Sequence, residues 1–139
     1  MIDKILVPID GSKNSEKSLK YACWLAQKVE AKITVLYVVP IPIDGQSAGL
    51  PIQPLVEAGE KILEKAKKTA KDANCKNTQF ILRQNPGNAG HEIVKYSQEQ
   101  NISLIIMNAK GHSKIKHLLL GSVSETVTKY APCSVMIVK

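Results

Sequence analysis

At 139 residues the chain is long enough for one domain with its own hydrophobic core, and its hydrophobic fraction of 44% and charged fraction of 22% are ordinary for a globular protein. Its apolar runs are far shorter than the roughly 20 residues of a membrane span, and the opening MIDKILVPID lacks the apolar region of a signal peptide, which favours a soluble, cytoplasmic protein. The net charge of +7 would attract an anionic ligand, but the lysines are mixed with glutamates and aromatic residues make up only 4%, which argues against a nucleic-acid partner.

The first half of the chain alternates between strand and helix patterns. Residues 4–9 form a short apolar run that ends in the turn sequence DGS, and apolar residues then recur every three or four positions over residues 19–29, which predicts a helix. Residues 32–39 are rich in β-branched side chains and predict a second strand. Residues 40–54 contain four prolines and two glycines and predict an irregular loop, after which helical spacing resumes over residues 55–73.

The second half continues the alternation. Residues 78–83 predict a third strand, less apolar than the first two and therefore expected near an edge of the sheet. A turn over residues 84–90 and a helix over residues 92–100 follow. Residues 103–107 are fully apolar and suit the centre of a parallel sheet.

The last thirty residues contain a long loop between two regular elements. We expect a loop over residues 108–121, a short helix over residues 122–130 that Pro132 brings to an end, and a fifth strand at Ser134–Val138. The whole chain, residues 1–139, is predicted to be one domain, with residues 40–54 as an irregular loop within it.

Five strands alternating with four helices predict an α/β fold, with one doubly wound, five-stranded parallel sheet and helices on both of its faces. Ligands of such sheets bind beyond the carboxyl ends of the strands, where the strand order reverses. The order 3-2-1-4-5 places strands one and four side by side at that point, and the loops after these strands carry the unusual residues. The flavodoxin-like order 2-1-3-4-5 would favour the loop after strand three, where Pro86, Gly87 and Gly90 indicate a simple turn. We therefore expect 3-2-1-4-5.

Residues 108–122 carry the groups best suited to bind an anion. Gly111 follows the apolar strand, where a missing side chain lets a ligand approach the backbone. Gly121 and Ser122 open a helix whose free N–H groups attract anions, and Ser122 and Ser124 add hydroxyl donors. Neither GxxxxGK[ST] nor GxGxxG is present, so a turn glycine and a routine helix cap remain the alternative. The nearest positive charges in the sequence are Lys110, Lys114 and Lys116.

The sequence contains, in this order, the five blocks KILVPIDGS, TVLYVV, IIMNAKGHS, LLLGSVSETV and APCSVMIVK. With these blocks the chain resembles a single-domain universal stress protein along nearly its whole length. Nucleotide-binding members of that family carry a glycine, two residues, a second glycine, nine residues, and a third glycine followed by serine or threonine. Gly111 and Gly121-Ser122 fit this pattern, whereas Asn108 stands at the first position.

The resemblance implies the adenine nucleotide alpha hydrolase-like version of the fold, with ATP, ADP or AMP bound across strands one and four. The site would consist of residues near the adenosine, apolar residues that form its walls, and residues that bind the phosphates. Mg²⁺ or Mn²⁺ would bind through phosphate oxygens. The residues so implied are Pro8, Ile9, Asp10, Val38, Met107, Asn108, Gly111, Gly121, Ser122, Val123 and Ser124. Asp10 has a structural alternative as a turn residue, and Val38 and Met107 would be buried without any ligand.

Asn108 departs from the motif, and two outcomes follow. Asparagine tolerates positive φ, so the backbone turn of a glycine would survive, and its amide would hydrogen-bond to the ligand. Alternatively, its side chain narrows the site, and the protein is a dimeric interaction protein that has lost nucleotide binding. We expect binding to be retained.

Catalysis requires an activated nucleophile or base, and the histidines are the obvious candidates. His91, His112 and His117 have no evident acidic partner in the sequence, so we expect a nucleotide-binding regulatory protein with little or no hydrolysis. A slow ATPase, or autophosphorylation at Ser122 or Ser124, is the alternative.

The three cysteines, Cys23, Cys75 and Cys133, are widely spaced without a CxxC pair, so we expect neither a disulfide framework nor a zinc site. Cys23 and Cys133 are expected in the core. A homodimer is expected through Ser134–Val138, because an edge strand presents unpaired backbone groups to a second copy.

Overall fold

The computed structural model describes residues 1–41, 51–111 and 119–139. Strands and helices alternate along these residues as β1 (Lys4–Ile9), α1 (Lys13–Val29), β2 (Lys32–Ile41), α2 (Gln53–Asp72), β3 (Thr78–Pro86), α3 (Ala89–Glu99), β4 (Leu104–Asn108), α4 (Ser122–Tyr130) and β5 (Ser134–Val138). The strands form one parallel sheet in the order β3-β2-β1-β4-β5, which confirms the predicted topology.

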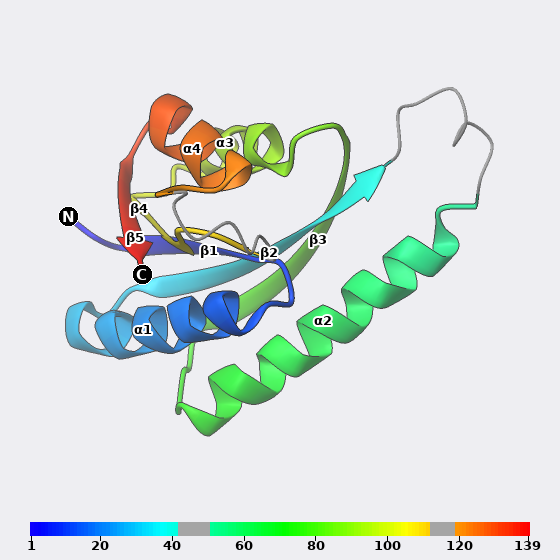
Figure 1. Ribbon diagram of the computed structural model, residues 1–139. Helices are drawn as coiled ribbons and strands as arrows, with labels where there is room; N and C mark the ends of the chain where they lie inside the picture. The colour runs from blue at the N-terminus through cyan, green and yellow to red at the C-terminus, as the bar shows by residue number, and fades with distance from the viewer. Residues whose placement is uncertain (42–50, 112–118) are drawn as a thin grey trace.

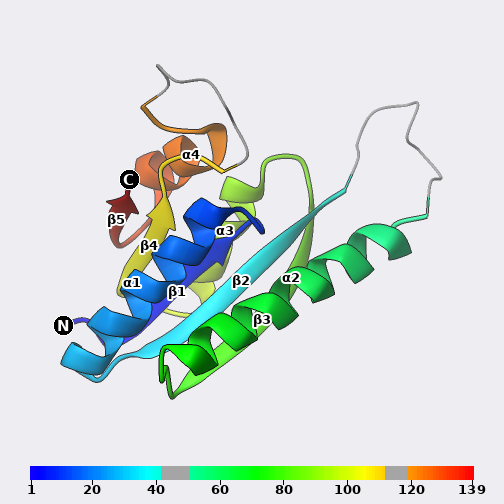
Figure 2. The ribbon, with the colours of Figure 1, turned by 60° about the horizontal axis from the view of Figure 1, so that its bottom comes forward.

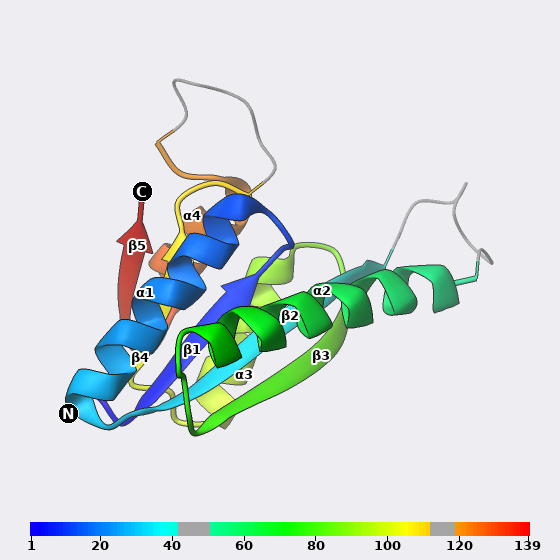
Figure 3. The same cartoon turned by 90° about the horizontal axis from the view of Figure 1, so that it is seen from below.

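The sheet is the middle of three layers. Helices α1 and α2 cover one face, and α3 and α4 cover the other (Figure 1). Seen from the side of the first pair, α1 crosses β1 and β4 while α2 crosses β2 and β3, so the two helices lie side by side (Figures 2 and 3). Strands β3 and β5 form the two edges, as expected for β3 from its weaker apolar character.

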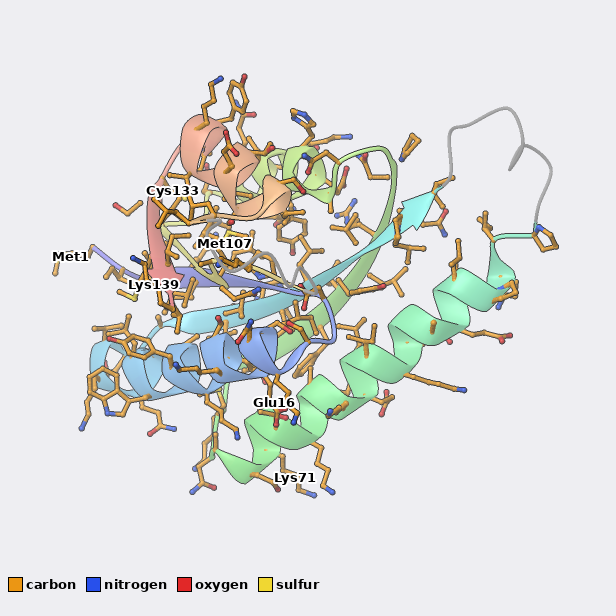
Figure 4. The ribbon with its side chains drawn as sticks, in the orientation of Figure 1. Met1, Glu16, Lys71, Met107, Cys133 and Lys139 are labelled. Carbon is orange, nitrogen blue, oxygen red and sulfur yellow. The ribbon has the colours of Figure 1, made fainter. Side chains whose placement is uncertain are left out.

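Each face of the sheet has its own hydrophobic core, because successive side chains of a strand point to opposite faces. Ile5, Val7 and Ile9 of β1 pack with α1 and α2, whereas Leu6 of the same strand packs with α3 and α4. Met107 and Cys133 lie on the α3–α4 side of the sheet (Figure 4). A central strand buried on both faces explains why the run KILVPI is almost continuously apolar.

Three of the helix starts are defined by local sequence. Ser12 caps α1, its Oγ accepting the backbone N–H of Ser15 at 3.2 Å, and Asn88 caps α3, its Oδ1 accepting the N–H of Gly90 at 2.6 Å. Proline in the first turn starts α2, where its missing N–H is not needed.

Several predicted boundaries were wrong by a few residues. Strand β2 runs on to Ile41 and α2 begins at Gln53, so the predicted loop at 40–54 is shorter at both ends, and residues 42–50 lie outside the described part of the chain. The predicted turn over residues 84–90 is also wrong, since β3 extends to Pro86 and α3 begins at Ala89. Proline is tolerated in β3 because this strand is at an edge. No helix within the described ranges is long and apolar enough to cross a membrane.

Candidate functional site

A cavity of about 400 Å³ opens at the carboxyl ends of β1, β2 and β4, where the strand order reverses. Its volume falls within the range of small-molecule sites. All eleven residues predicted for a nucleotide site line it, although they come from four separate parts of the chain. The lining residues are Pro8, Ile9, Asp10, Leu36, Tyr37, Val38, Pro40, Ala89, Ile93, Met107, Asn108, Ala109, Gly111, Gly121, Ser122, Val123 and Ser124.

Asp10 and Gly111 pack against each other across strands β1 and β4. The Asp10 Oδ1 accepts the backbone N–H of Ser12 at 2.9 Å, which orients the carboxylate at the start of α1. A β carbon at Gly111 would overlap the Asp10 carboxylate in its present position, so a larger residue there would displace that carboxylate. Gly111 has no positive φ, so the glycine is explained by this close approach and not by an unusual backbone conformation.

The first turn of α4 lines the same cavity. Gly121 is its N-cap and supplies no side-chain cap, unlike Ser12 of α1 and Asn88 of α3. The N–H groups of the first turn of a helix have no acceptor within the helix, and the positive end of the helix dipole lies there. A β carbon at Gly121 would have ordinary contacts only, the nearest being the Ala109 carbonyl oxygen at 3.4 Å, so the chain has room for a larger residue at this position.

Ser124 has a structural role that the sequence did not reveal. It is buried, and its Oγ donates to the Ala109 carbonyl oxygen at 2.5 Å, while the N–H of Gly121 donates to the same oxygen at 2.7 Å. These bonds hold the end of β4 against the start of α4. The Ser124 hydroxyl proton is therefore engaged within the protein, whereas Ser122 is exposed at the helix start.

Asn108, the departure from the motif, is the last residue of β4 and is 7% exposed. Its φ is not positive, so the expected need for a glycine-like turn was wrong, because extended strand backbone suits any residue. The Asn108 Nδ2 donates to the Lys110 carbonyl oxygen at 2.6 Å. Among the described residues no donor reaches Asn108 Oδ1, which leaves an acceptor at the cavity wall.

Tyr37 and the residues from α3 are parts of the cavity that sequence reasoning missed. The Tyr37 ring packs against Gly59 of α2, which leaves room for it: a β carbon at Gly59 would lie only 2.6 Å from the Tyr37 Cε1. Burial raises the pKa of the Tyr37 phenol, and the charge of Asp10 raises it further, so the hydroxyl stays protonated and can donate. Ala89 was missed because its helix was expected to start at residue 92, and Ile93 because its contact with the cavity depends on how α3 packs on the sheet.

The structure offers no catalytic pairing at this cavity among the residues it describes. His91 is exposed on α3 with its ring 6.2 Å from that of Tyr130, away from the cavity lining. His112, His117, Lys114 and Lys116 lie outside the described residues. Within the described ranges, no three His, Cys, Asp or Glu side chains gather in a way that would hold a metal ion.

Comparison with known proteins places this geometry in context. The sequence matches the model of the Universal stress protein family over residues 1–139. It is 35% identical to the Universal stress protein MJ0531 of Methanocaldococcus jannaschii, across 98% of this chain and 81% of that protein. The fold superposes on the universal stress protein UspA from Lactobacillus plantarum with a TM-score of 0.78 at 25% identity, covering 99% of this chain and 98% of that one.

Two further solved proteins share the fold and contain nucleotides. One is a universal stress protein in complex with cAMP, with a TM-score of 0.75 at 23% identity, covering 99% of this chain and 97% of that one. The other is the universal stress protein from Archaeoglobus fulgidus in complex with dAMP, with a TM-score of 0.75 at 21% identity and full coverage of both chains.

Proposed function

Because the chain belongs to the universal stress protein family, we propose that it binds ATP or a related adenine nucleotide in the cavity between β1, β2 and β4 and acts as a nucleotide-dependent regulatory protein. The observation that carries the proposal is the convergence of an uncapped helix start and an apolar cleft in one cavity of about 400 Å³. The cAMP and dAMP complexes of two proteins with this fold support the choice of an adenine nucleotide.

The phosphate groups are assigned to the start of α4. The backbone N–H groups of Ser122, Val123 and Ser124 have no acceptor within the helix, and no side chain caps them. Phosphate oxygens are strong acceptors and would complete these bonds while the helix dipole favours their charge. The Ser122 hydroxyl adds a further donor. Ser124 acts through its bond to Ala109 by holding the helix start in place.

The adenosine is assigned to the opposite end of the cavity. Val38 on β2 and Met107 on β4 offer apolar contact from either side of β1, which contributes Pro8 and Ile9 to the lining. Acceptors at Asp10 and Asn108 suit the hydroxyl groups of a ribose, which are donors. This division of donors and acceptors gives a nucleotide one preferred direction in the cavity.

A divalent cation fits this site only through the ligand. The described residues provide no cluster of three metal-binding side chains, and Mg²⁺ is commonly held by nucleotide phosphates with few protein ligands. When bound, such a cation would neutralise part of the phosphate charge. We expect little or no hydrolysis, and a single-turnover assay with Mg-ATP would distinguish this from a slow ATPase.

The proposal is tested by examining protein purified without added nucleotide. After denaturation, chromatography and mass spectrometry of the supernatant should identify an adenine nucleotide, and Mg-ATP or AMP should raise the melting temperature of stripped protein. A clean supernatant together with no thermal shift at millimolar Mg-ATP would contradict the proposal. GTP and CTP are the matched controls and should give smaller shifts.

A second candidate is a dimeric interaction protein that does not bind nucleotide, and Asn108 is the observation that favours it. Its side chain is buried at the cavity wall, where the family motif has glycine. In this case no nucleotide would change the melting temperature of the stripped protein, and none would change its self-association.

Both candidates include a homodimer through β5. This strand ends the sheet next to β4, and the residues Val135–Val138 are half-buried, as expected for a strand whose outer side is uncovered. Pairing two copies of β5 about a two-fold axis would extend the sheet across the dimer. Trp24 is 54% exposed on α1, and Lys17 of the same helix reaches the Lys139 carbonyl oxygen just beyond β5, so the indole lies on the flank beside this edge.

A further inference from the structure

Two of the three cysteines meet on the α1–α2 side of the sheet. Cys23 lies in the middle of α1 and is fully buried. Cys75 follows the end of α2 by three residues and is half-buried. Their thiols lie close enough for each to shift the pKa of the other, although 52 positions separate the two residues in the sequence.

The surrounding backbone holds Cys75 in this position. Its N–H donates to the Ala70 carbonyl oxygen at 2.9 Å, at the end of α2. Gln27, one turn beyond Cys23 on α1, donates from Nε2 to the Ala73 carbonyl oxygen at 2.9 Å and to that of Asn74 at 3.3 Å. The residue before Cys75 is therefore tied directly to the helix that carries Cys23. Both sulfur atoms also pack in the same hydrophobic core.

The two thiols differ in a way that assigns them different roles. The neighbouring Cys23 thiol lowers the pKa of the Cys75 thiol, because it stabilises the thiolate. The interaction with Cys75, together with burial, raises the pKa of the Cys23 thiol, which therefore stays protonated. The nucleophile is thus the sulfur that is partly exposed, and its partner is the sulfur that is shielded from solvent.

We propose that Cys75 and Cys23 are a peroxide-reactive pair that closes into a reversible disulfide between α1 and the segment after α2. The Cys75 thiolate attacks one oxygen of hydrogen peroxide, the O–O bond breaks, hydroxide leaves, and Cys75 becomes a sulfenic acid. The Cys23 thiol then attacks the Cys75 sulfur, the S–O bond breaks, and water leaves with the thiol proton. Sulfur loses two electrons in total and the peroxide gains them.

Closure brings the two sulfur atoms to about 2.05 Å from each other. Cys75 lies outside α2 and before β3, so its backbone can adjust without disturbing either element. The pair is also separate from the proposed nucleotide site, because neither cysteine lines that cavity. Its chemistry can therefore succeed or fail independently of nucleotide binding.

Peptide mapping tests the proposal directly. The full-length protein is treated with hydrogen peroxide, denatured in N-ethylmaleimide, and digested with trypsin without reduction. The expected product joins peptide 21–28 to peptide 72–76 at a mass two hydrogens below their sum, and dithiothreitol should restore both peptides. Peptide 130–139 provides an internal control: Cys133 is half-buried and burial raises its pKa, so it should remain alkylated. Cys75 should be lost at least about ten times as fast as Cys133.

Two variants separate the steps. Cys75→Ser should remove the cross-link and leave Cys23 alkylated, since the buried thiol is not reached by peroxide. Cys23→Ser, whose hydroxyl can still donate to the Cys75 sulfur, should leave Cys75 as a sulfenic acid that dimedone traps, and circular dichroism checks that this variant is folded. Alkylation of all three cysteines after peroxide treatment, or oxidation of Cys133 at the same rate as Cys75, would overturn the proposal. So would a cross-link formed only between two copies of peptide 72–76.

Discussion

The side chain of Asn108 occupies space that the family motif leaves to glycine, and its own hydrogen bond decides how that space is used. Because the amide nitrogen donates to the Lys110 carbonyl oxygen, the amide oxygen is left as the acceptor at the cavity wall. An acceptor repels a phosphate oxygen but receives a hydroxyl proton. In the proposed binding mode, Asn108 would therefore favour a ribose beside β4 and the phosphates further along, at α4.

Replacing Asn108 by glycine distinguishes the two interpretations of this residue. If the amide oxygen accepts from the nucleotide, Asn108→Gly should weaken binding about fivefold, the worth of one hydrogen bond of about 1 kcal/mol. It should also lower the stability of the protein by roughly 0.5–1 kcal/mol, since glycine is unfavourable in a strand. Isothermal titration calorimetry with ATP measures the first effect, and urea denaturation measures the second. Tighter binding by the variant would instead show that Asn108 narrows the site.

Gly121 allows binding to be separated from folding. Asp is a preferred N-cap residue, and its carboxylate suits the positive end of a helix, so Gly121→Asp should leave α4 as stable or slightly more stable. The same carboxylate would take the N–H groups assigned to phosphate and repel it. We expect the melting temperature without ligand to be equal or higher, and the shift caused by Mg-ATP to disappear. A retained shift would mean that the phosphates bind elsewhere.

Strand β5 is the edge through which the proposed dimer would form. The Val138 carbonyl oxygen accepts the N–H of Ala109, so the backbone groups of Val138 point toward β4. Those of Met136 point the same way, and those of Val135 and Ile137 point outward, because the direction alternates along a strand. The outward groups are available to a second copy of β5.

This alternation yields a matched pair of proline variants. Val135→Pro removes an outward N–H and should convert the dimer to a monomer while the fold persists, since proline is tolerated at a sheet edge. Met136→Pro removes an N–H directed at β4 and should destabilise the subunit itself. Sedimentation velocity measures the association state, and the fluorescence of Trp24 reports a change beside the edge. A wild-type protein that sediments as a monomer at micromolar concentration would refute the dimer.

The sequence predicted the elements better than their ends. The bounds of β1, α4 and β5 match the apolar patterns because polar residues or a proline stand directly beside them. The ends of β2 and β3 were missed because both strands continue through prolines that an isolated segment would not favour, and pairing between these two strands supports them to Ile41 and Pro86.

The candidate site was predicted as a set of residues but not as a set of contacts. Motif spacing identified Gly111 and Gly121. It did not reveal that Gly111 packs against the carboxylate of Asp10, which is 101 positions away in the sequence. Tyr37 of β2 was missed for a related reason: its ring packs against Gly59 of α2, which is distant in the sequence. Likewise, nothing in the spacing of Cys23 and Cys75 indicates that their thiols meet.

The cavity is lined by residues from both hydrophobic cores of the molecule. Ile9 belongs to the core under α1 and α2, while Val38, Ile93 and Met107 belong to the core under α3 and α4, and all four line the cavity. A ligand bound there contacts both cores at once. Its binding free energy should therefore stabilise the molecule as one cooperative unit.

Chemical denaturation tests this coupling. At a nucleotide concentration 100 times the Kd, the free energy of unfolding should rise by about 2.7 kcal/mol. The Trp24 fluorescence on α1 and the far-ultraviolet circular dichroism of all helices should shift together. If the dichroism shifted while the Trp24 transition stayed in place, the cavity would be coupled to one core only.

The strand order also has a consequence for how the protein is made on the ribosome. Strand β1 is synthesised first, yet its second neighbour in the sheet is β4, which emerges about a hundred residues later. Until β4 is synthesised, the edge of β1 that pairs with it has no partner strand. Asp10 likewise has neither its contact with Gly111 nor the start of α4 beside it. If the cavity binds a nucleotide as proposed, a nascent chain could not form the site before Ser124 has emerged.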